Sequence, residues 1–177
     1  MNAAAKRLPG VEVYRGRVAR DWIDVNRHMN VAYYVLAFDY GVDALWTRFG
    51  ITEASIAATG QSTFAVESHV TYQAELRLDE EFIVTSQILA YDRKRLHQFQ
   101  RMFRAHDMAL AASCEWMNLH VDLGERKVVP WPETVLDKIA ALAAAQRGAD
   151  PPAEAGQQMR VREPLYKGFR RYGERDA

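Results

Sequence analysis

The sequence is poor in cysteine, with Cys114 as its single thiol among 177 residues. One thiol excludes an intrachain disulfide and any zinc site that needs paired cysteines. We expect Cys114, which lies on an apolar run beside Trp116, to be a small buried hydrophobe, because no neighbouring base would activate it. The first ten residues also lack the continuous apolar core of a secretory signal. We therefore expect a cytoplasmic location.

Charge of either sign is not in surplus, because 23 basic side chains balance 23 acidic ones. Without a global positive field, a nucleic-acid partner is not expected. The composition, 49% hydrophobic and 26% charged, also argues against a membrane protein. Five histidines are present, but no HxH, HxxxH or HExxH pair occurs, so we expect no metal and no other cofactor.

The length of 177 residues suits one domain with a sizeable core. We expect this domain to span residues 1–147. After that point, paired prolines, paired glutamines and a basic run show no sustained periodicity. Residues 148–177 are therefore expected to form a tail that is mobile or packed on a partner subunit.

Polar residues gather just before an apolar helix in the stretch from Asp24 to Tyr34. Asp24, Asn26 and His28 alternate at a spacing of two, so in an extended segment they would project from one side. The helix is predicted to begin near Asn30. Its first turn would offer unpaired N–H groups and a partial positive charge, which stabilise an anion such as an oxyanion. We interpret this stretch as a candidate active site.

Helical periodicity is strongest from Val31 to Phe49, where much of the opposite side is apolar as well. Gly50 is placed to end this helix in a left-handed cap. A short helix or ordered loop is expected from Ile51 to Gly60, and an alanine-rich, peripheral helix from about Glu133 to Gln146.

Strand-like runs occupy most of the remaining chain, and their short connections predict antiparallel pairing of sequential strands. In the longest run, Phe64 and Tyr72 share one face and Glu67 and His69 the other. A helix that is apolar on nearly all sides is buried only if the sheet curls around it, which predicts an α+β fold. The expected strands are Val11–Val18, Thr63–Leu76, Phe82–Tyr91, Leu96–Ala105, Leu110–Val121 and Lys127–Val129.

The run Asp-x-Asn-x-His-Met-Asn, followed shortly by Tyr, resembles the signature of single-hotdog-domain thioesterases of the 4-hydroxybenzoyl-CoA thioesterase-like superfamily. It is also similar to Asp-x-Asn-x-His-Val-Asn of plant acyl-ACP thioesterases. A looser resemblance covers roughly residues 12 to 135, including Glu67–Tyr72, Lys94–His97 and Leu119–Asp122. It implies a hotdog fold, in which a long apolar helix is wrapped by a curved antiparallel sheet of five to six strands. It also implies hydrolysis of an acyl-CoA thioester to a free acid and CoA.

The better-studied bacterial branch of this superfamily carries Asp-x-x-Gly and then an aromatic residue before its helix, whereas Asn26 and His28 occupy that loop here. The aspartate therefore transfers to Asp24 more directly than the oxyanion donors do. Asp24 is expected to act as general base on water or as a nucleophile that forms a mixed anhydride. Asn26 could hold water or the substrate carbonyl, and His28 could orient Asp24 or donate to the thioester oxygen.

The helix start completes the candidate site, with Asn30, Val31 and Tyr34 expected to contact the oxyanion or the substrate. A purely structural alternative stays open. Asp24 or Asn30 could simply cap the helix, since both residue types are favoured at N-caps. In that case His28 would hydrogen-bond to backbone.

Two further groups of residues have both a functional and a plain interpretation. Glu67 and His69 could supply a second carboxylate facing the helix start, or they could lie on an exposed strand face. Arg93, Lys94 and Arg95 could bind the phosphates of CoA, or they could form a solvated hairpin turn.

One sheet cannot cover both sides of the long helix, and its edge would stay exposed. Hotdog proteins pair their protomers edge to edge, with active sites at the shared boundary. The resemblance therefore implies a homodimer or a dimer-based homotetramer. Two rivals to an acyl-CoA thioesterase remain: a hotdog protein that binds acyl-CoA without turnover, and a hotdog hydratase.

The acyl group is suggested by the run from Asp21 to Asn30, which resembles thioesterases associated with carnitine breakdown that act on betainyl-CoA. A quaternary ammonium group gains most from the faces of aromatic rings. The alternative is a short or medium aliphatic acyl-CoA, since aromatic residues at helical spacing usually belong to the core. Nearby aromatic candidates are Trp22, Tyr33, Tyr34, Phe38 and Trp46.

Overall fold

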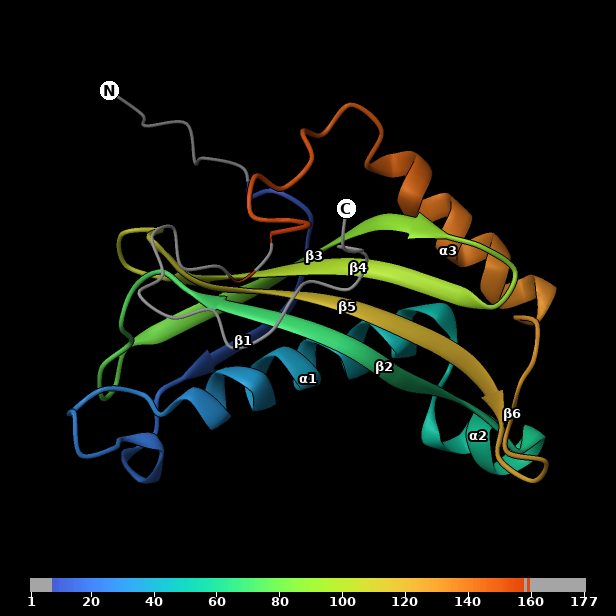
Figure 1. Ribbon diagram of the computed structural model, residues 1–177, viewed down its shortest axis with the longest axis horizontal. Coiled ribbons are helices and arrows are strands. Elements are labelled where there is room, and N and C mark those ends of the chain that lie inside the picture. The colour runs from blue at the N-terminus through green and yellow to red at the C-terminus, as the bar shows by residue number, and fades with distance from the viewer. Residues whose placement is uncertain (1–7, 158, 160–177) are drawn as a thin grey trace, which may run out of the picture.

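The computed structural model describes residues 8–157 and 159. A six-stranded antiparallel sheet curls over one long helix, with two shorter helices at its margins (Figure 1). The expected α+β architecture of five to six strands is confirmed. The elements are β1 (Val11–Arg17), η1 (Arg20–Trp22), α1 (Val31–Phe49), α2 (Glu53–Thr59), β2 (Gln61–Tyr72), β3 (Glu81–Tyr91), β4 (Arg95–Arg104), β5 (Leu110–Asp122), β6 (Lys127–Val128) and α3 (Glu133–Ala145).

Helix α1 has the bounds that its periodicity predicts. The Asn30 side chain accepts a hydrogen bond from the Ala32 amide at 3.0 Å and caps the N-terminus. Gly50 ends the helix at φ 92°, a left-handed conformation that costs glycine little. Phe38 and Leu45 are completely buried between α1 and the sheet. This helix is the centre of the core.

The predicted strands agree with the structure to within one or two residues, except at the end of β2. That strand stops at Tyr72 rather than at Leu76. The amides of Gln73 and Ala74 both donate to the Ala111 carbonyl, at 2.8 and 3.0 Å, so the regular ladder with β5 ends there. Residues 73–80 leave the sheet as a connection to β3.

The strand order is β1-β3-β4-β5-β2, with β6 paired to β5. The prediction that sequential strands pair is confirmed from β3 to β5. It is wrong for β2, which pairs with β5 instead of β3. Strand β3 already has β1 on one side and β4 on the other, so neither of its edges is open to β2 over the paired length. Residues 73–80 must therefore cross the end of the sheet to reach β3.

A bulge interrupts β2 at Val66, which lies between the pairs Ala65↔Asn118 and Glu67↔Met117. Because a bulge adds one residue to one strand, the alternation of side chains reverses across it. Phe64 is therefore on the opposite face from Tyr72, and the expectation that both share one face is wrong. Strand β2 is an edge of the sheet, and Phe64, Val66 and Tyr72 are 37%, 55% and 47% exposed.

Helix α3 lies at the margin of the sheet, but Val135 and Ile139 anchor it to the core. The reason lies in the sheet. Strand β1 pairs with β3 only as far as Ser86, which leaves the rest of the β3 edge uncovered. The Gln146 side chain closes this edge, because it accepts from the Ile88 amide at 2.9 Å and donates to the Ser86 carbonyl at 3.2 Å.

The segment after α3 lies against the sheet of its own chain. Arg101 contacts Glu154 at 2.8 Å, and the Gly156 amide donates to the Glu115 carboxylate at 2.7 Å. These contacts hold residues 150–156 on the face of the sheet that points away from α1. Most of the predicted tail, residues 160–177, lies outside the described residues, so its mobile or partner-bound state stays a prediction.

A buried histidine links the far end of β5 to α3. His120 is 2% exposed and stacks on Trp131, with ring centroids 4.9 Å apart. Its Nδ1 lies 2.8 Å from the Pro130 carbonyl, which can only accept, so the neutral ring donates from this nitrogen. Burial lowers the pKa of His120 below its ordinary value.

We predict that His120 makes the fold sensitive to mild acid. The pKa of His120 is lower in the folded chain than in the unfolded chain. Below about pH 6.5, His120 is therefore protonated in the unfolded chain while it stays neutral in the folded chain. Stability should therefore fall as the pH drops through that window. Between pH 7.5 and 5.5, the melting temperature of the wild type should fall by about 2–4 °C more than that of His120→Gln. Equal slopes in calorimetry would show that His120 contributes nothing.

Candidate active site

The loop before α1 is a tight turn, not the extended segment that its alternation suggests. The Asp24 amide donates to the His28 carbonyl at 3.1 Å, and the Arg27 amide donates to the Asp24 carbonyl at 3.0 Å. Ile23 and Met29 form an antiparallel bridge at the base. Arg27 accommodates the reversal with φ 67°. Asp24 and His28 are therefore neighbours at the base of one turn.

The Asp24 carboxylate is held from within this turn. One oxygen, Oδ1, accepts from the Asn26 amide at 2.8 Å, while Oδ2 has a longer contact of 3.4 Å with the Asn26 side-chain nitrogen. The first bond is an Asx-type turn, which fixes the direction of the carboxylate. Asn26 thus orients Asp24, and Oδ2 is the oxygen with more capacity to accept another proton donor.

The start of α1 combines capping with an open donor. The Asn30 side chain accepts a hydrogen bond from the Ala32 amide at 3.0 Å, and the Asn30 carbonyl accepts one from the Tyr33 amide at 3.0 Å. The Val31 amide has no part in these capping bonds. Asn30 is therefore a cap, as the structural alternative has it, and the Val31 N–H is a first-turn donor that takes no part in the capping bonds.

A pocket of about 240 Å³ lies where the loop and α1 meet the end of β2. Three of the predicted site residues, His28, Val31 and Tyr34, line it. Asp24 and Asn26, which belong to the same turn as His28, do not line it. The remaining lining residues are Met29, Tyr72, Gln73, Ala74 and Glu75.

Tyr34 fixes the wall of this pocket. Its hydroxyl accepts from the Leu76 amide at 2.9 Å and lies 3.5 Å from the Ala74 carbonyl. The ring meets Tyr72 edge to face, with centroids 5.3 Å apart. Burial raises the pKa of Tyr34, and the carboxylates of Glu75 and Glu80 add to this effect, so the phenol stays neutral. Tyr34 therefore acts as a hydrogen-bonding group and an aromatic surface.

His28 is half-buried at the mouth of the pocket. Its Nδ1 lies 3.2 Å from the Met29 carbonyl, which again can only accept. The ring thus donates from Nδ1 to backbone, as the structural alternative has it, and Nε2 is the atom left for a substrate.

Glu67 and His69 do not face the helix start. Glu67 pairs with Met117 and His69 with Glu115, and cross-strand partners point to the same face of a sheet. The Cys114 and Trp116 side chains, which alternate with these partners, are buried in the core with α1. Glu67 and His69 therefore lie on the face away from α1, and one protomer does not bring them to the pocket.

The basic cluster lies at the other end of the sheet, in the turn between β3 and β4 (Figure 1). Arg93 contacts Glu133 at 3.4 Å and Arg95 contacts Asp92 at 3.1 Å. The Lys94 amide donates to the Asp92 carboxylate at 2.8 Å, and such backbone bonds lower the pKa of Asp92. Within one protomer, this exposed turn is a strand length away from the pocket.

The aromatic residues near the loop have separate roles. Phe38 and Trp46 are core residues, at 0% and 4% exposure. Trp22 and Tyr33 stack on each other at 5.2 Å. Of the five aromatic candidates, Tyr34 alone lines the pocket.

Sequence reasoning missed Tyr72 and Glu75 as site residues. Both become neighbours of the loop only because residues 73–80 cross the end of the sheet. No local signal marked them, because apolar and polar residues continue to alternate from Tyr72 to Leu76 although the strand ends at Tyr72.

Within residues 8–157 and 159, no group of three or more histidine, cysteine, aspartate or glutamate side chains is arranged to hold a metal ion. None of the described helices is long and apolar enough to cross a membrane. Cys114 is buried, and burial raises the pKa of its thiol, so it is not a reactive nucleophile.

Comparison with known proteins decides the family. Residues 18–139 match the model of the thioesterase-like superfamily. The chain belongs to the thioesterase-like superfamily. As a member of this superfamily it is a thioester hydrolase, and the resemblance carried by the loop before α1 is confirmed.

Two relatives share this family membership. The betainyl-CoA thioesterase of Pseudomonas aeruginosa is 33% identical over 144 residues, which cover 81% of this chain and 91% of the relative. The L-carnitine dehydrogenase/betainyl-CoA thioesterase of Rhizobium meliloti is 34% identical over 143 residues. That match covers 81% of this chain but 29% of the larger protein.

A solved structure supports the fold. The Staphylococcus aureus protein SAV2348, determined in complex with CoA, superimposes with a TM-score of 0.81 at 27% sequence identity. The match covers 89% of this chain and 99% of that one. The hotdog fold expected from the sequence is confirmed.

Proposed function

We propose that this thioesterase hydrolyses acyl-CoA, with Asp24 as its catalytic carboxylate and the start of α1 as its oxyanion site. The observation that carries the proposal is the pocket that joins His28, Val31 and Tyr34 to the end of β2. It is bounded on one side by the first turn of a helix, and the turn that supplies His28 to it also carries Asp24, whose carboxylate is fixed in direction by Asn26. A thioester hydrolase needs these two components, since its thiolate leaves without much acid assistance.

The reaction begins when Asp24 Oδ2 takes a proton from water and the resulting hydroxide adds to the carbonyl carbon. The carbonyl oxygen becomes an oxyanion, which the Val31 N–H and the positive end of α1 stabilise. The C–S bond then breaks, and the electron pair leaves with the CoA thiolate. The thiolate regains a proton from solvent or from the protonated Asp24. His28 Nε2 is placed to hold the thioester or the water.

A nucleophilic route uses the same geometry. Asp24 attacks the carbonyl carbon, the CoA thiolate leaves, and water hydrolyses the mixed anhydride. The sequence left two alternative functions open, an acyl-CoA-binding protein without turnover and a hydratase. Neither of them would release free thiol from acyl-CoA. An acyl-CoA panel followed by thiol release separates them from the thioesterase.

The acyl group that fits the pocket best is betainyl, the substrate that names both relatives. Tyr34 and Tyr72 meet edge to face at 5.3 Å, and Glu75, whose carboxylate contacts Arg77 at 3.5 Å, lines the same pocket. A trimethylammonium group accepts no hydrogen bond, so aromatic faces and a negative charge are the groups that can favour it. The aromatic enclosure is therefore Tyr34 with Tyr72, rather than Phe38 and Trp46.

We also propose that two protomers pair through β2, as a homodimer or within a dimer-based tetramer. Strand β2 is an edge with exposed apolar side chains, and Val31 and Val35 of α1 are exposed by 55% and 36%. Antiparallel pairing of two β2 edges would set the Gln61 end of one protomer beside the Tyr72 end of the other. The basic turn Arg93–Arg95 of one chain would then approach the pocket of its partner and could hold CoA phosphates.

The first prediction concerns the carboxylate. Asp24→Asn keeps the shape and the bond to the Asn26 amide but removes the base or nucleophile. Turnover of the best acyl-CoA should fall about a hundredfold or more, with an unchanged melting temperature. Asp21→Asn, an exposed aspartate three residues earlier, is the matched control and should stay near wild type. Full turnover in Asp24→Asn would identify Asp24 as a structural residue.

The second prediction isolates the charge of the acyl group. 3,3-Dimethylbutanoyl-CoA has the shape of betainyl-CoA but carries carbon in place of the ammonium nitrogen. Wild type should prefer betainyl-CoA by about tenfold or more in kcat/KM. Glu75→Gln should reduce this ratio, while Glu125→Gln, which removes another exposed glutamate with an ion-pair partner, should not. A preference for the uncharged acyl group would exclude the betaine specificity and leave the hydrolysis intact.

The third prediction concerns assembly. Light scattering should give a dimer or tetramer at micromolar concentration. Val66→Asp places a charge on the β2 edge and should shift the protein toward monomer, whereas Val128→Asp on β6 should not. Monodisperse wild-type monomer would contradict pairing through β2.

A further inference from the structure

The connection from β2 to β3 forms the wall of the pocket that faces the helix start. Its backbone is tied to the catalytic loop and to α1. The Met29 amide donates to the Leu76 carbonyl at 2.7 Å, and the Leu76 amide donates to the Tyr34 hydroxyl at 2.9 Å. Any movement of residues 74–76 would therefore move Met29 as well.

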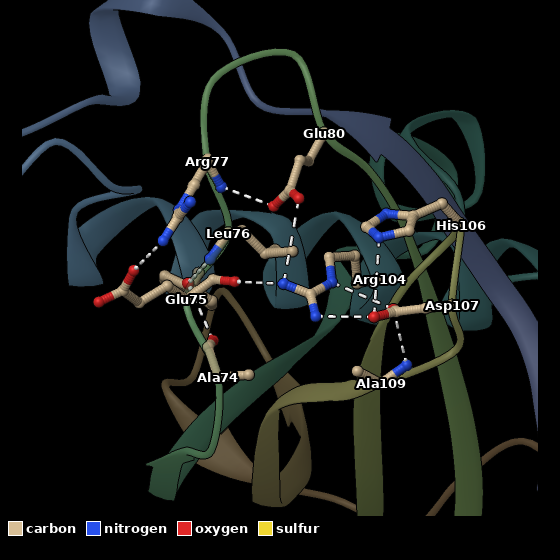
Figure 2. Close-up of polar contacts among 10 residues, drawn as sticks. Ala74, Glu75, Leu76, Arg77, Glu80, Arg104, His106, Asp107 and Ala109 are labelled. Carbon is tan, nitrogen blue, oxygen red and sulfur yellow. Dashed lines mark hydrogen bonds and ion pairs between the residues drawn. The ribbon is translucent and has the colours of Figure 1, made fainter.

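Arg104, at the end of β4, contacts this connection, and its guanidinium lies between Glu75 and Asp107 (Figure 2). Its guanidinium makes a forked pair with Asp107, with Nε–Oδ1 at 3.1 Å and Nη2–Oδ2 at 2.7 Å. The third nitrogen, Nη1, donates to the Glu75 carbonyl at 3.4 Å and lies 4.0 Å from the Glu80 carboxylate. One side chain thus joins the β4–β5 turn to both ends of the crossing connection.

The partners of Arg104 are themselves fixed. Asp107 Oδ1 also accepts from the Ala109 amide at 3.1 Å, and Glu80 Oε2 accepts from the Arg77 amide at 2.8 Å. The hydrogen bond from Arg104 holds the pKa of Asp107 well below its usual range, so the pair stays ionised at neutral pH. These bonds make the cluster a rigid anchor. The Arg104 side chain is 24% exposed.

We infer that Arg104 is a positioning residue for the active site: it fixes the Glu75 carbonyl, and through Leu76 it fixes the amide of Met29 and the loop that carries Asp24. Its effect on catalysis rests on the proposed function, whereas its effect on the backbone does not. Arg104 is not a catalytic residue, since it lies behind the pocket wall and does not line the pocket.

The geometry of the fork decides which substitution is informative. A lysine keeps the positive charge and still reaches Asp107, but a single ammonium group cannot bind the carboxylate through two parallel bonds and the Glu75 carbonyl as well. Arg104→Lys should therefore keep the β4–β5 turn and release the connection.

Arg101 offers a matched control on the same strand. Its Nε and Nη2 both donate to Glu154 Oε2, at 3.1 and 2.8 Å, and its third nitrogen donates to the Gln87 side chain at 3.2 Å. These contacts lie on the face of the sheet away from α1. Arg101→Lys thus removes a guanidinium that also binds a carboxylate through two nitrogens but has no link to residues 74–76.

The test is amide hydrogen exchange of the full-length wild type, Arg104→Lys and Arg101→Lys under native conditions. Exchange at Met29 and Leu76 should be at least about tenfold faster in Arg104→Lys and unchanged in Arg101→Lys. Both variants should melt within a few degrees of each other. Unchanged protection of Met29 and Leu76 in folded Arg104→Lys would overturn the inference. Faster exchange at Ala109 alone would also overturn it, because Arg104 would then only support the β4–β5 turn.

Kinetics with the best acyl-CoA complete the test. Arg104→Lys should lower kcat/KM about tenfold, with a fall in kcat because the loop with Asp24 is displaced. Arg101→Lys should match wild type. If exchange increases but kcat/KM does not change in an active enzyme, the catalytic part of the inference is overturned. If wild type hydrolyses no acyl-CoA, the proposed function fails while the exchange result still decides the backbone role.

Discussion

The hydrogen bond from the Met29 amide to the Leu76 carbonyl joins the two parts of the active site, and the arrangement of the pocket depends on it. One part is the turn and helix start, to which we assign the chemistry in our proposal. The other is the connection between β2 and β3, which must cross the end of the sheet because β3 is already paired on both sides. Tyr34 and Arg104 both hydrogen-bond to this connection, so the fold itself brings the wall of the pocket to the helix start.

Most of the fold was predictable from the sequence because its signals are local. The 3.6-residue period of α1 and the cap residues Asn30 and Gly50 give that helix its bounds, and short turns give β3, β4 and β5 their antiparallel pairing. The place of β2 was not predictable in this way, since it depends on which strand edges are free. The bulge at Val66 and the burial of α3 against the open β3 edge likewise follow from tertiary packing.

In the candidate site, too, the residues with local sequence signals were predictable and those brought in by tertiary packing were not. The loop motif identified the family, and His28, Val31 and Tyr34 do meet in one pocket. Tyr72 and Glu75 were missed because they are distant in sequence and reach the pocket only through the crossing connection. Alternation also gave no reason to separate Glu67 and His69 from the helix start, because which face of β2 meets α1 is decided by its pairing with β5.

The central claim is that the thioester carbonyl lies between Asp24 and the first turn of α1. A crystal structure with an inert analogue of betainyl-CoA, in which a methylene group separates the carbonyl from sulfur, tests it most directly. The account predicts the carbonyl oxygen within about 3 Å of the Val31 amide, with Asp24 facing the carbonyl carbon and the ammonium group against Tyr34 and Tyr72. An analogue bound with its acyl group elsewhere, and this pocket empty, would contradict it.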